Sequence, residues 1–163
     1  MATRCVFLPE SANFPSTNMP APGVDGQLRP YLAFDATTDE SCDWSGVAPQ
    51  GLTGALTAII TYRMASATTG AARWQVAIEA ITDGDAVDTN AASSFDTSNS
   101  NGATVPGTAG HIDQLSVTLT NADSMAAGDY FRLRLNRDAD GTSGTDDATG
   151  DAQVLMVELR DAA

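Results

Sequence analysis

The densest group of side chains that could do chemistry lies between residues 138 and 151. It consists of the aspartates Asp138, Asp140, Asp146, Asp147 and Asp151. Carboxylate oxygens are the hard ligands that calcium prefers. The order differs from an EF-hand loop, because glycine follows the second aspartate directly. Aspartate is also a turn residue, so we explain the segment by turns and solubility. We predict no metal and no cofactor, and leave calcium binding by this loop open. A shorter group, Asp83, Asp85 and Asp88, shows the same pattern more weakly.

Catalytic arrangements find little support in the sequence. His111 is the only histidine, and no nucleophile-elbow pattern surrounds any serine. Paired carboxylates would suggest glycoside hydrolysis. The four glutamates, which are Glu10, Glu40, Glu79 and Glu158, form no pair by their spacing, and Glu79 falls on the polar face of its strand. We therefore predict no catalytic residues and a protein that is not an enzyme, with a small hydrolase as a distant alternative.

Aromatic residues, which often form sugar-binding platforms, make up only 6% of the chain. The pattern places Trp74, Tyr62 and Phe131 on apolar strand faces, which is typical of core residues. Trp44, Tyr31 and Tyr130 are freer, but they are scattered along the sequence. They do not by themselves define a platform.

Short alternating segments dominate the sequence after residue 29. In one, Phe131, Leu133 and Leu135 alternate with polar residues, which puts the apolar groups on one face of a strand. About eight such strands are expected, near residues 30–35, 42–47, 56–64, 74–79, 93–97, 115–120, 131–136 and 154–159. Glycine-rich turns separate them, and long loops cover residues 82–110 and 138–150. The pattern predicts an all-β antiparallel sandwich of jelly-roll type, with an immunoglobulin-like sandwich as the runner-up.

Acidic residues greatly outnumber basic ones in this chain. The chain of 163 residues has 21 acidic and 8 basic residues, a net charge of −13, and no lysine. Such a field repels phosphate backbones and anionic lipid, so we expect no nucleic-acid or membrane partner. Cys5 and Cys42 have no metal or redox spacing, and two free thiols are expected. No export signal is recognisable near the start of the sequence.

The first 29 residues have no strand or helix period. Isolated apolar residues stand among prolines here, and we expect an extended N-terminal arm (residues 1–29) before a β-sandwich domain (residues 30–163). Phe7, Leu8, Phe14 and Met19 are the expected partner contacts of this arm, because isolated apolar groups are costly to leave in water. The alternative is that residues 1–28 fold back on their own domain or stay disordered.

Five stretches of the domain resemble a family of small β-sandwich proteins encoded among the virion structural genes of tailed bacteriophages. These stretches are RPYLAFDATTDESCDWSGVAPQG (29–51), YRMASATTG (62–70), SSFDTSNSNGATVPGTAG (93–110), LTNADSMAAGDYFRLRLNRD (119–138) and TGDAQVLMVELRD (149–161). The similarity is one of overall pattern and contains no catalytic motif.

The resemblance implies a jelly-roll head decoration, or cement, protein. It would be made in the host cytoplasm, form a homotrimer, and stabilise the outer surface of the capsid. Its partners would then be the major capsid protein and other copies of itself. The competing hypothesis is a glycan- or receptor-binding β-sandwich module on a virion surface or tail fibre.

Overall fold

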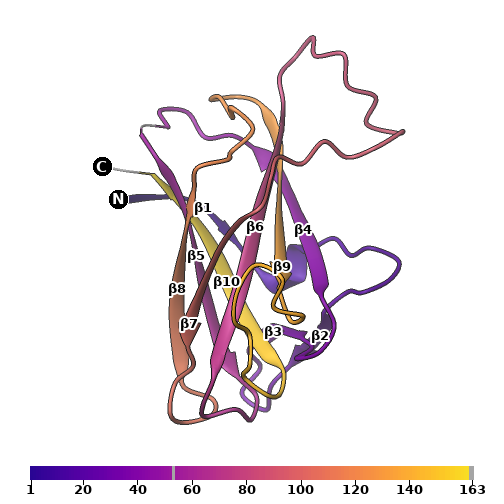
Figure 1. Ribbon diagram of the computed structural model, residues 1–163. Helices are drawn as coiled ribbons and strands as arrows, with labels where there is room; N and C mark the ends of the chain where they lie inside the picture. The colour runs from indigo at the N-terminus through magenta and orange to yellow at the C-terminus, as the bar shows by residue number, and fades with distance from the viewer. Residues whose placement is uncertain (53, 162–163) are drawn as a thin grey trace.

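The computed structural model describes residues 1–52 and 54–161, and two antiparallel sheets pack face to face in it (Figure 1). The larger sheet has the order β2-β3-β10-β5-β8, with β1 also paired to β10, and the smaller has the order β4-β9-β6-β7. Their bounds are β1 Ala2–Phe7, β2 Ala21–Val24, β3 Pro30–Phe34, β4 Glu40–Val47, β5 Leu56–Met64, β6 Ala71–Ile81, β7 Asn99–Thr104, β8 Ile112–Leu119, β9 Tyr130–Arg137 and β10 Ala152–Asp161. A single turn of 3-10 helix, η1, spans Pro9–Ser11.

The fold confirms the expected all-β antiparallel sandwich of jelly-roll type. Within the described residues there are ten strands where about eight were expected. The strands before residue 30 were missed, and residues 93–97 form no strand, because β7 begins at Asn99. None of the described helices is long or apolar enough to cross a bilayer.

Alternation along the strands builds the core as the sequence predicts. In β9, Phe131, Leu133 and Leu135 are fully buried between the sheets. β5 contributes Leu56, Ala58, Ile60, Tyr62 and Met64 from one face, all buried. Burying a large apolar side chain stabilises the fold by about 1.5–3 kcal/mol, so these two strands supply much of the driving force.

The last strand contains a break in its alternation. The pairing of β10 with β5 shifts between Val154 and Met156, which leaves one extra residue on β10. Val154 faces the core before this bulge, and Val157 and Leu159 face it afterwards. An extra residue inverts the two faces of a strand. Without the bulge, simple alternation would put Val154 and Val157 on opposite faces.

The N-terminal segment is integrated into the sandwich. β1 hydrogen-bonds to the second half of β10, and β2 pairs with β3. Phe7 is only 7% exposed, and its ring centroid lies 5.9 Å from that of Trp44 and 6.1 Å from that of Phe131. The Trp44 indole N–H donates a hydrogen bond to the carbonyl of Leu8. The expected arm over residues 1–29 therefore lies on its own domain, which was the alternative considered above.

Candidate functional site

The outer face of the four-stranded sheet carries an ordered lattice of polar side chains. Strand register places Arg132 of β9 between Ser45 of β4 and Glu79 of β6. One step further along, Arg134 lies between Asp43 and Ala77 on the same strands. Because side chains alternate across a strand, these residues point away from the core that Phe131, Leu133 and Leu135 fill.

Two guanidinium groups in this lattice are held by two carboxylates. Arg134 donates from Nε and Nη2 to the two oxygens of Asp43, at 2.7 and 2.9 Å. Arg132 donates from Nε to Glu79 at 2.5 Å, and its Nη1 lies 3.5 Å from Asp43. Asp43 therefore contacts both guanidinium groups and fixes their spacing. Bidentate geometry of this kind is the strong form of the arginine–carboxylate contact.

Glu79 connects the sheet to the loop of residues 82–98. Its side chain accepts hydrogen bonds from the backbone N–H and the hydroxyl of Ser94, at 2.5 and 3.2 Å. Burial raises the pKa of Glu79, but the hydrogen bonds from Arg132 and Ser94 outweigh that effect and hold this pKa below its ordinary value of 4.5. The hydrogen bond to Glu79 likewise raises the pKa of Arg132. The pair is therefore charged at neutral pH, although Glu79 is only 2% exposed.

Phe95 covers the pair of guanidinium groups from the same loop. Its ring centroid lies 4.7 Å from the Arg132 guanidinium carbon and 4.1 Å from that of Arg134. Arginine stacks well on aromatic rings, and such contacts contribute about 0.5–2 kcal/mol. The backbone N–H of Asp96 donates to the carbonyl of Ile78, so residues 94–96 are anchored while residues 82–93 are exposed.

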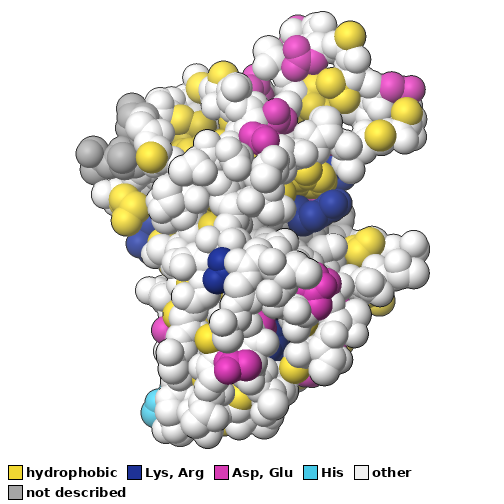
Figure 2. All heavy atoms as spheres, in the orientation of Figure 1, with side chains coloured by type: hydrophobic (Ala, Val, Ile, Leu, Met, Phe, Trp, Pro, Cys, Tyr) yellow, Lys and Arg dark blue, Asp and Glu magenta, His cyan; other side chains and the backbone are white. Residues whose placement is uncertain are grey.

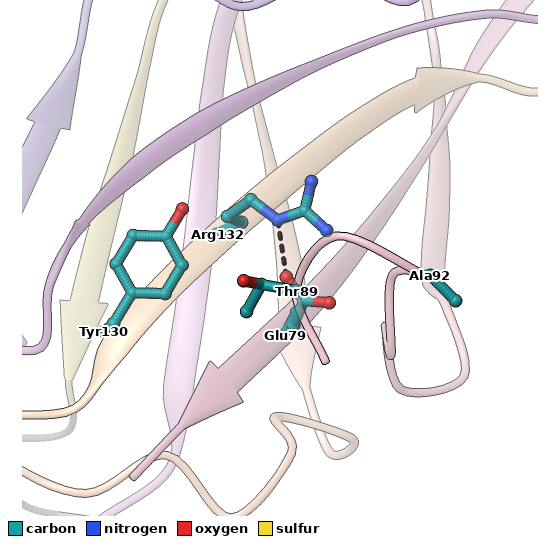
Figure 3. A pocket seen from close by; sticks show the side chains of 5 residues that line it. All are labelled: Glu79, Thr89, Ala92, Tyr130 and Arg132. Atoms are coloured by element: carbon teal, nitrogen blue, oxygen red, sulfur yellow. Dashed lines mark hydrogen bonds and ion pairs between the residues drawn. The ribbon is translucent and has the colours of Figure 1, made fainter. Parts of the chain in front are cut away.

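A hollow of about 110 Å³ lies where this loop meets the sheet, lined by Glu79, Thr89, Ala92, Tyr130 and Arg132. Figure 1 shows two segments projecting from this side of the sandwich, residues 82–98 and residues 12–20. Figure 2 shows a recess between the projections, with arginine (dark blue) beside hydrophobic groups (yellow). In Figure 3, Tyr130 and Arg132 stand on β9 and Glu79 on β6, with Thr89 and Ala92 opposite them on the loop.

The lining combines one exposed aromatic ring with groups that both donate and accept hydrogen bonds. The Tyr130 side chain is 44% exposed, and its hydroxyl lies 3.3 Å from that of Ser45. Further along the lattice, the amide of Asn136 donates to Gln75 at 3.3 Å. Sugar hydroxyls also donate and accept, and the C–H face of a pyranose ring packs well on an aromatic ring. The arrangement suits non-covalent binding of a polyhydroxylated ligand.

A second hollow, of about 220 Å³, lies on the larger sheet. It is lined by Pro9, Glu10, Pro22, Gly23, Val24, Pro30 and Tyr31. Tyr31 packs against Gly23, where a Cβ atom would come within 2.5 Å of the ring. The lining is mainly proline and aliphatic and offers few groups that could orient a polar ligand, so the first hollow is the better candidate.

Carboxylates of the acidic loop after β9 have structural partners. Asp146 binds the fully buried Arg137 through both oxygens, at 2.8 and 3.0 Å, and Asp147 accepts from the Ala71 backbone N–H at 2.7 Å. Asp138 accepts from the backbone and hydroxyl of Ser143. These contacts agree with the turn explanation of the sequence.

One group of carboxylates in this region could hold a cation. Oxygens of Asp39, Asp138 and Asp140 lie within 4.8 Å of one another. This group is not the one expected from the sequence, because Asp146 and Asp147 are engaged elsewhere and Asp39 comes from a distant segment. The absence of a metal stays a prediction.

Of the four expected partner contacts, one is buried and three are exposed. Phe7 fills the core and is not available to a partner, which corrects the expectation for that residue. Leu8, Phe14 and Met19 are 49%, 39% and 46% exposed. Trp44, expected to be free, is 1% exposed. His111 lies exposed in the turn before β8.

Sequence reasoning missed most of the site, although part of the signal was present. The alternation of β9 already placed Arg132 and Arg134 together on the outer face. The sequence around Asp43 did not indicate that it belongs to a site, because its contacts with the arginines depend on the register between β4 and β9. Phe95 fell in a segment wrongly expected to be a strand.

No family model and no curated protein matches the chain. Among solved structures, it is similar to a family 35 carbohydrate binding module from an environmental isolate, with a TM-score of 0.53, 14% identity and coverage of 98% of both chains. It also matches the C-terminal CBM6 of LamC from Zobellia galactanivorans, with a TM-score of 0.49, 16% identity and coverage of 96% of this chain and 98% of that one. The CBM22-1 xylan-binding domain of Paenibacillus barcinonensis Xyn10C matches with a TM-score of 0.49 at 12% identity, covering all of both chains. At such identities the likeness shows the fold alone.

These comparisons overturn the resemblance to phage proteins. The structure that matches with a TM-score of 0.53 is a carbohydrate binding module and not a virion protein, so the prediction of a virion head decoration protein is wrong. The major capsid protein as partner and the capsid-bound homotrimer are withdrawn with it. The resemblance rested on short strands and aspartate-rich turns, which acidic β-sandwiches of unrelated function share, and it contained no site motif.

Proposed function

We propose that this chain is a carbohydrate-binding β-sandwich module that attaches a polysaccharide-degrading enzyme to its substrate and contributes no chemistry itself. The observation that carries the proposal is the hollow beside Tyr130, where an exposed ring adjoins the charged pair of Arg132 and Glu79. The likeness in fold to a carbohydrate binding module supports it.

Binding would follow from two complementary surfaces. The exposed face of Tyr130 supplies flat apolar area with little side-chain entropy to lose. Arg132 and Thr89 supply polar groups on opposite sides of the hollow. A bound glycan would exchange its hydrogen bonds to water for hydrogen bonds to these fixed protein groups. Its affinity would come from the few contacts that are well matched in shape and polarity.

The test is affinity electrophoresis and calorimetry against a panel of soluble neutral polysaccharides: hydroxyethyl cellulose, xylan, galactan, mannan and laminarin. Tyr130→Ala should weaken binding at least tenfold, which corresponds to about 1.4 kcal/mol. Ile112→Ala is the matched control, because Ile112 is 63% exposed on β8 of the other sheet. Absence of binding to every polysaccharide, or equal losses in both variants, would refute the proposal.

A further inference from the structure

We infer that the site accepts uncharged glycans and rejects anionic ones, and that Asp43 and Glu79 are the residues that set this specificity. The inference rests on the proposed function and extends it to the class of ligand. It follows from how the charges of Arg132 and Arg134 are cancelled within the lattice.

Each guanidinium group already has a carboxylate partner. Asp43 binds Arg134 at 2.7 and 2.9 Å and approaches Arg132 at 3.5 Å, and Glu79 binds Arg132 at 2.5 Å. The two positive and two negative groups of the lattice therefore sum to zero, and one pair, Arg132 and Glu79, lines the hollow itself. A lattice built to hold an anion would leave at least one guanidinium unpaired.

The carboxylates lie below the surface and the guanidinium groups reach it. The side chains of Asp43 and Glu79 are 13% and 3% exposed, against 25% and 37% for Arg132 and Arg134. Arg134 Nη1 donates to none of the residues that the structure describes, so its N–H groups remain for a ligand. A sugar hydroxyl can accept from such a donor without adding charge to the site.

A carboxylate or sulfate on the ligand would find no unpaired guanidinium group in the lattice, because Asp43 and Glu79 already neutralise Arg132 and Arg134. The projecting loop adds the negative charges of Asp83, Asp85 and Asp88, which are exposed. That loop, residues 82–98, contains no arginine, and the chain as a whole carries −13. Like charges within a Debye length of about 8–10 Å repel at moderate salt, so an anionic glycan pays a penalty that a neutral one does not.

The test compares each neutral polysaccharide of the panel with its carboxymethylated derivative, which keeps the backbone and adds charge. We expect the native protein to bind the carboxymethylated form at least tenfold more weakly than the neutral form at low salt, and we expect this affinity ratio to fall as salt rises. Asp43→Asn should reduce the affinity ratio about tenfold, and Glu79→Gln should also reduce it. Asp151→Asn is the matched control, because it makes the same change in net charge at an exposed position before β10.

The outcomes separate this inference from the proposed function. Equal or tighter binding of the carboxymethylated form by the native protein would overturn the inference while leaving carbohydrate binding intact. The inference would also be overturned if Asp151→Asn reduced the affinity ratio between the two forms as much as Asp43→Asn does, because net charge alone would then explain the specificity. The salt dependence of the native protein needs no variant, so the test survives if either substitution prevents folding. Binding to no member of the panel would refute the proposed function itself.

Discussion

Replacing Phe7 with alanine tests whether the N-terminal segment is part of the fold. Phe7 is 7% exposed and packs between Trp44 and Phe131, with ring centroids at 5.9 and 6.1 Å. Truncating a buried phenylalanine removes its transfer free energy and leaves a cavity, which together cost about 3–5 kcal/mol. The cavity would open against two rigid rings on the other sheet, which leaves little room for relaxation, so the upper half of this range is expected.

A loss of this size is readily measured. For a chain of 150–250 residues, each kcal/mol corresponds to about 2–4 °C in Tm, so a loss of about 4–5 kcal/mol in Phe7→Ala should lower Tm by about 8–20 °C. Urea unfolding followed by tryptophan fluorescence should show the same loss, because Trp44 is one of the two tryptophans and contacts Phe7 directly. Val6→Ala is the control on the same strand, since Val6 is 51% exposed and its truncation should change stability by no more than about 0.5 kcal/mol.

The comparison of Phe7→Ala with Val6→Ala can refute this role of Phe7. If Phe7→Ala shifts Tm by no more than Val6→Ala does, then Phe7 does not hold β1 against the core, and residues 1–29 would behave as the separate arm expected from the sequence. A large loss for both variants would instead indicate that strand pairing with β10, and not the ring contacts, holds the segment.

Two further predictions concern charge. Asp146→Asn should cost about 3–5 kcal/mol in urea unfolding, because it leaves the buried Arg137 without its carboxylate partner. Asp147→Asn should cost at most about half as much, because within the described residues the Asp147 side chain accepts from the backbone N–H of Ala71 and pairs with no arginine. Equal losses in the two variants would contradict the role given to the ion pair. Stability should also fall as pH drops below about 4.5. Despite burial, hydrogen bonds hold the pKa of Glu79 and of Asp138 below their ordinary values of 4.5 and 3.8. The stability that these two carboxylates contribute is therefore complete above their ordinary pKa values and is lost as pH falls through their folded-state pKa values. A Tm that is level from pH 7 to pH 3 would contradict this.

Local periodicity was sufficient to predict the central strands. β5 is buried on both faces apart from Arg63. In β9, alternation reflects one fully buried and one partly exposed face, and this constraint acts residue by residue. It fails in β7, Asn99–Thr104, because an edge strand of polar residues carries no apolar alternation. It fails again at the bulge in β10, where one unpaired residue at Leu155 inverts the faces without any signal in residue type.

The N-terminal strand could not be read from its own sequence. Its order comes from Phe7 meeting Trp44, 37 residues later, and from pairing with β10 at the far end of the chain. Contacts at such separation are set by the assembled sheets and not by local propensity. The same reason hid the candidate site, since Asp43 acquires its role only when β4 lies beside β9.

Several of the acidic residues that give the chain its negative charge have a structural role in the turns. Asp25 accepts from the backbone N–H groups of Gln27 and Arg29, and Asp129 accepts from that of Ala126. These carboxylates replace the backbone partners that turns lack. The negative charge is therefore in part a consequence of building long ordered loops without helices. Carboxylates also neutralise the basic residues, because each of the eight arginines forms an ion pair with an aspartate or glutamate.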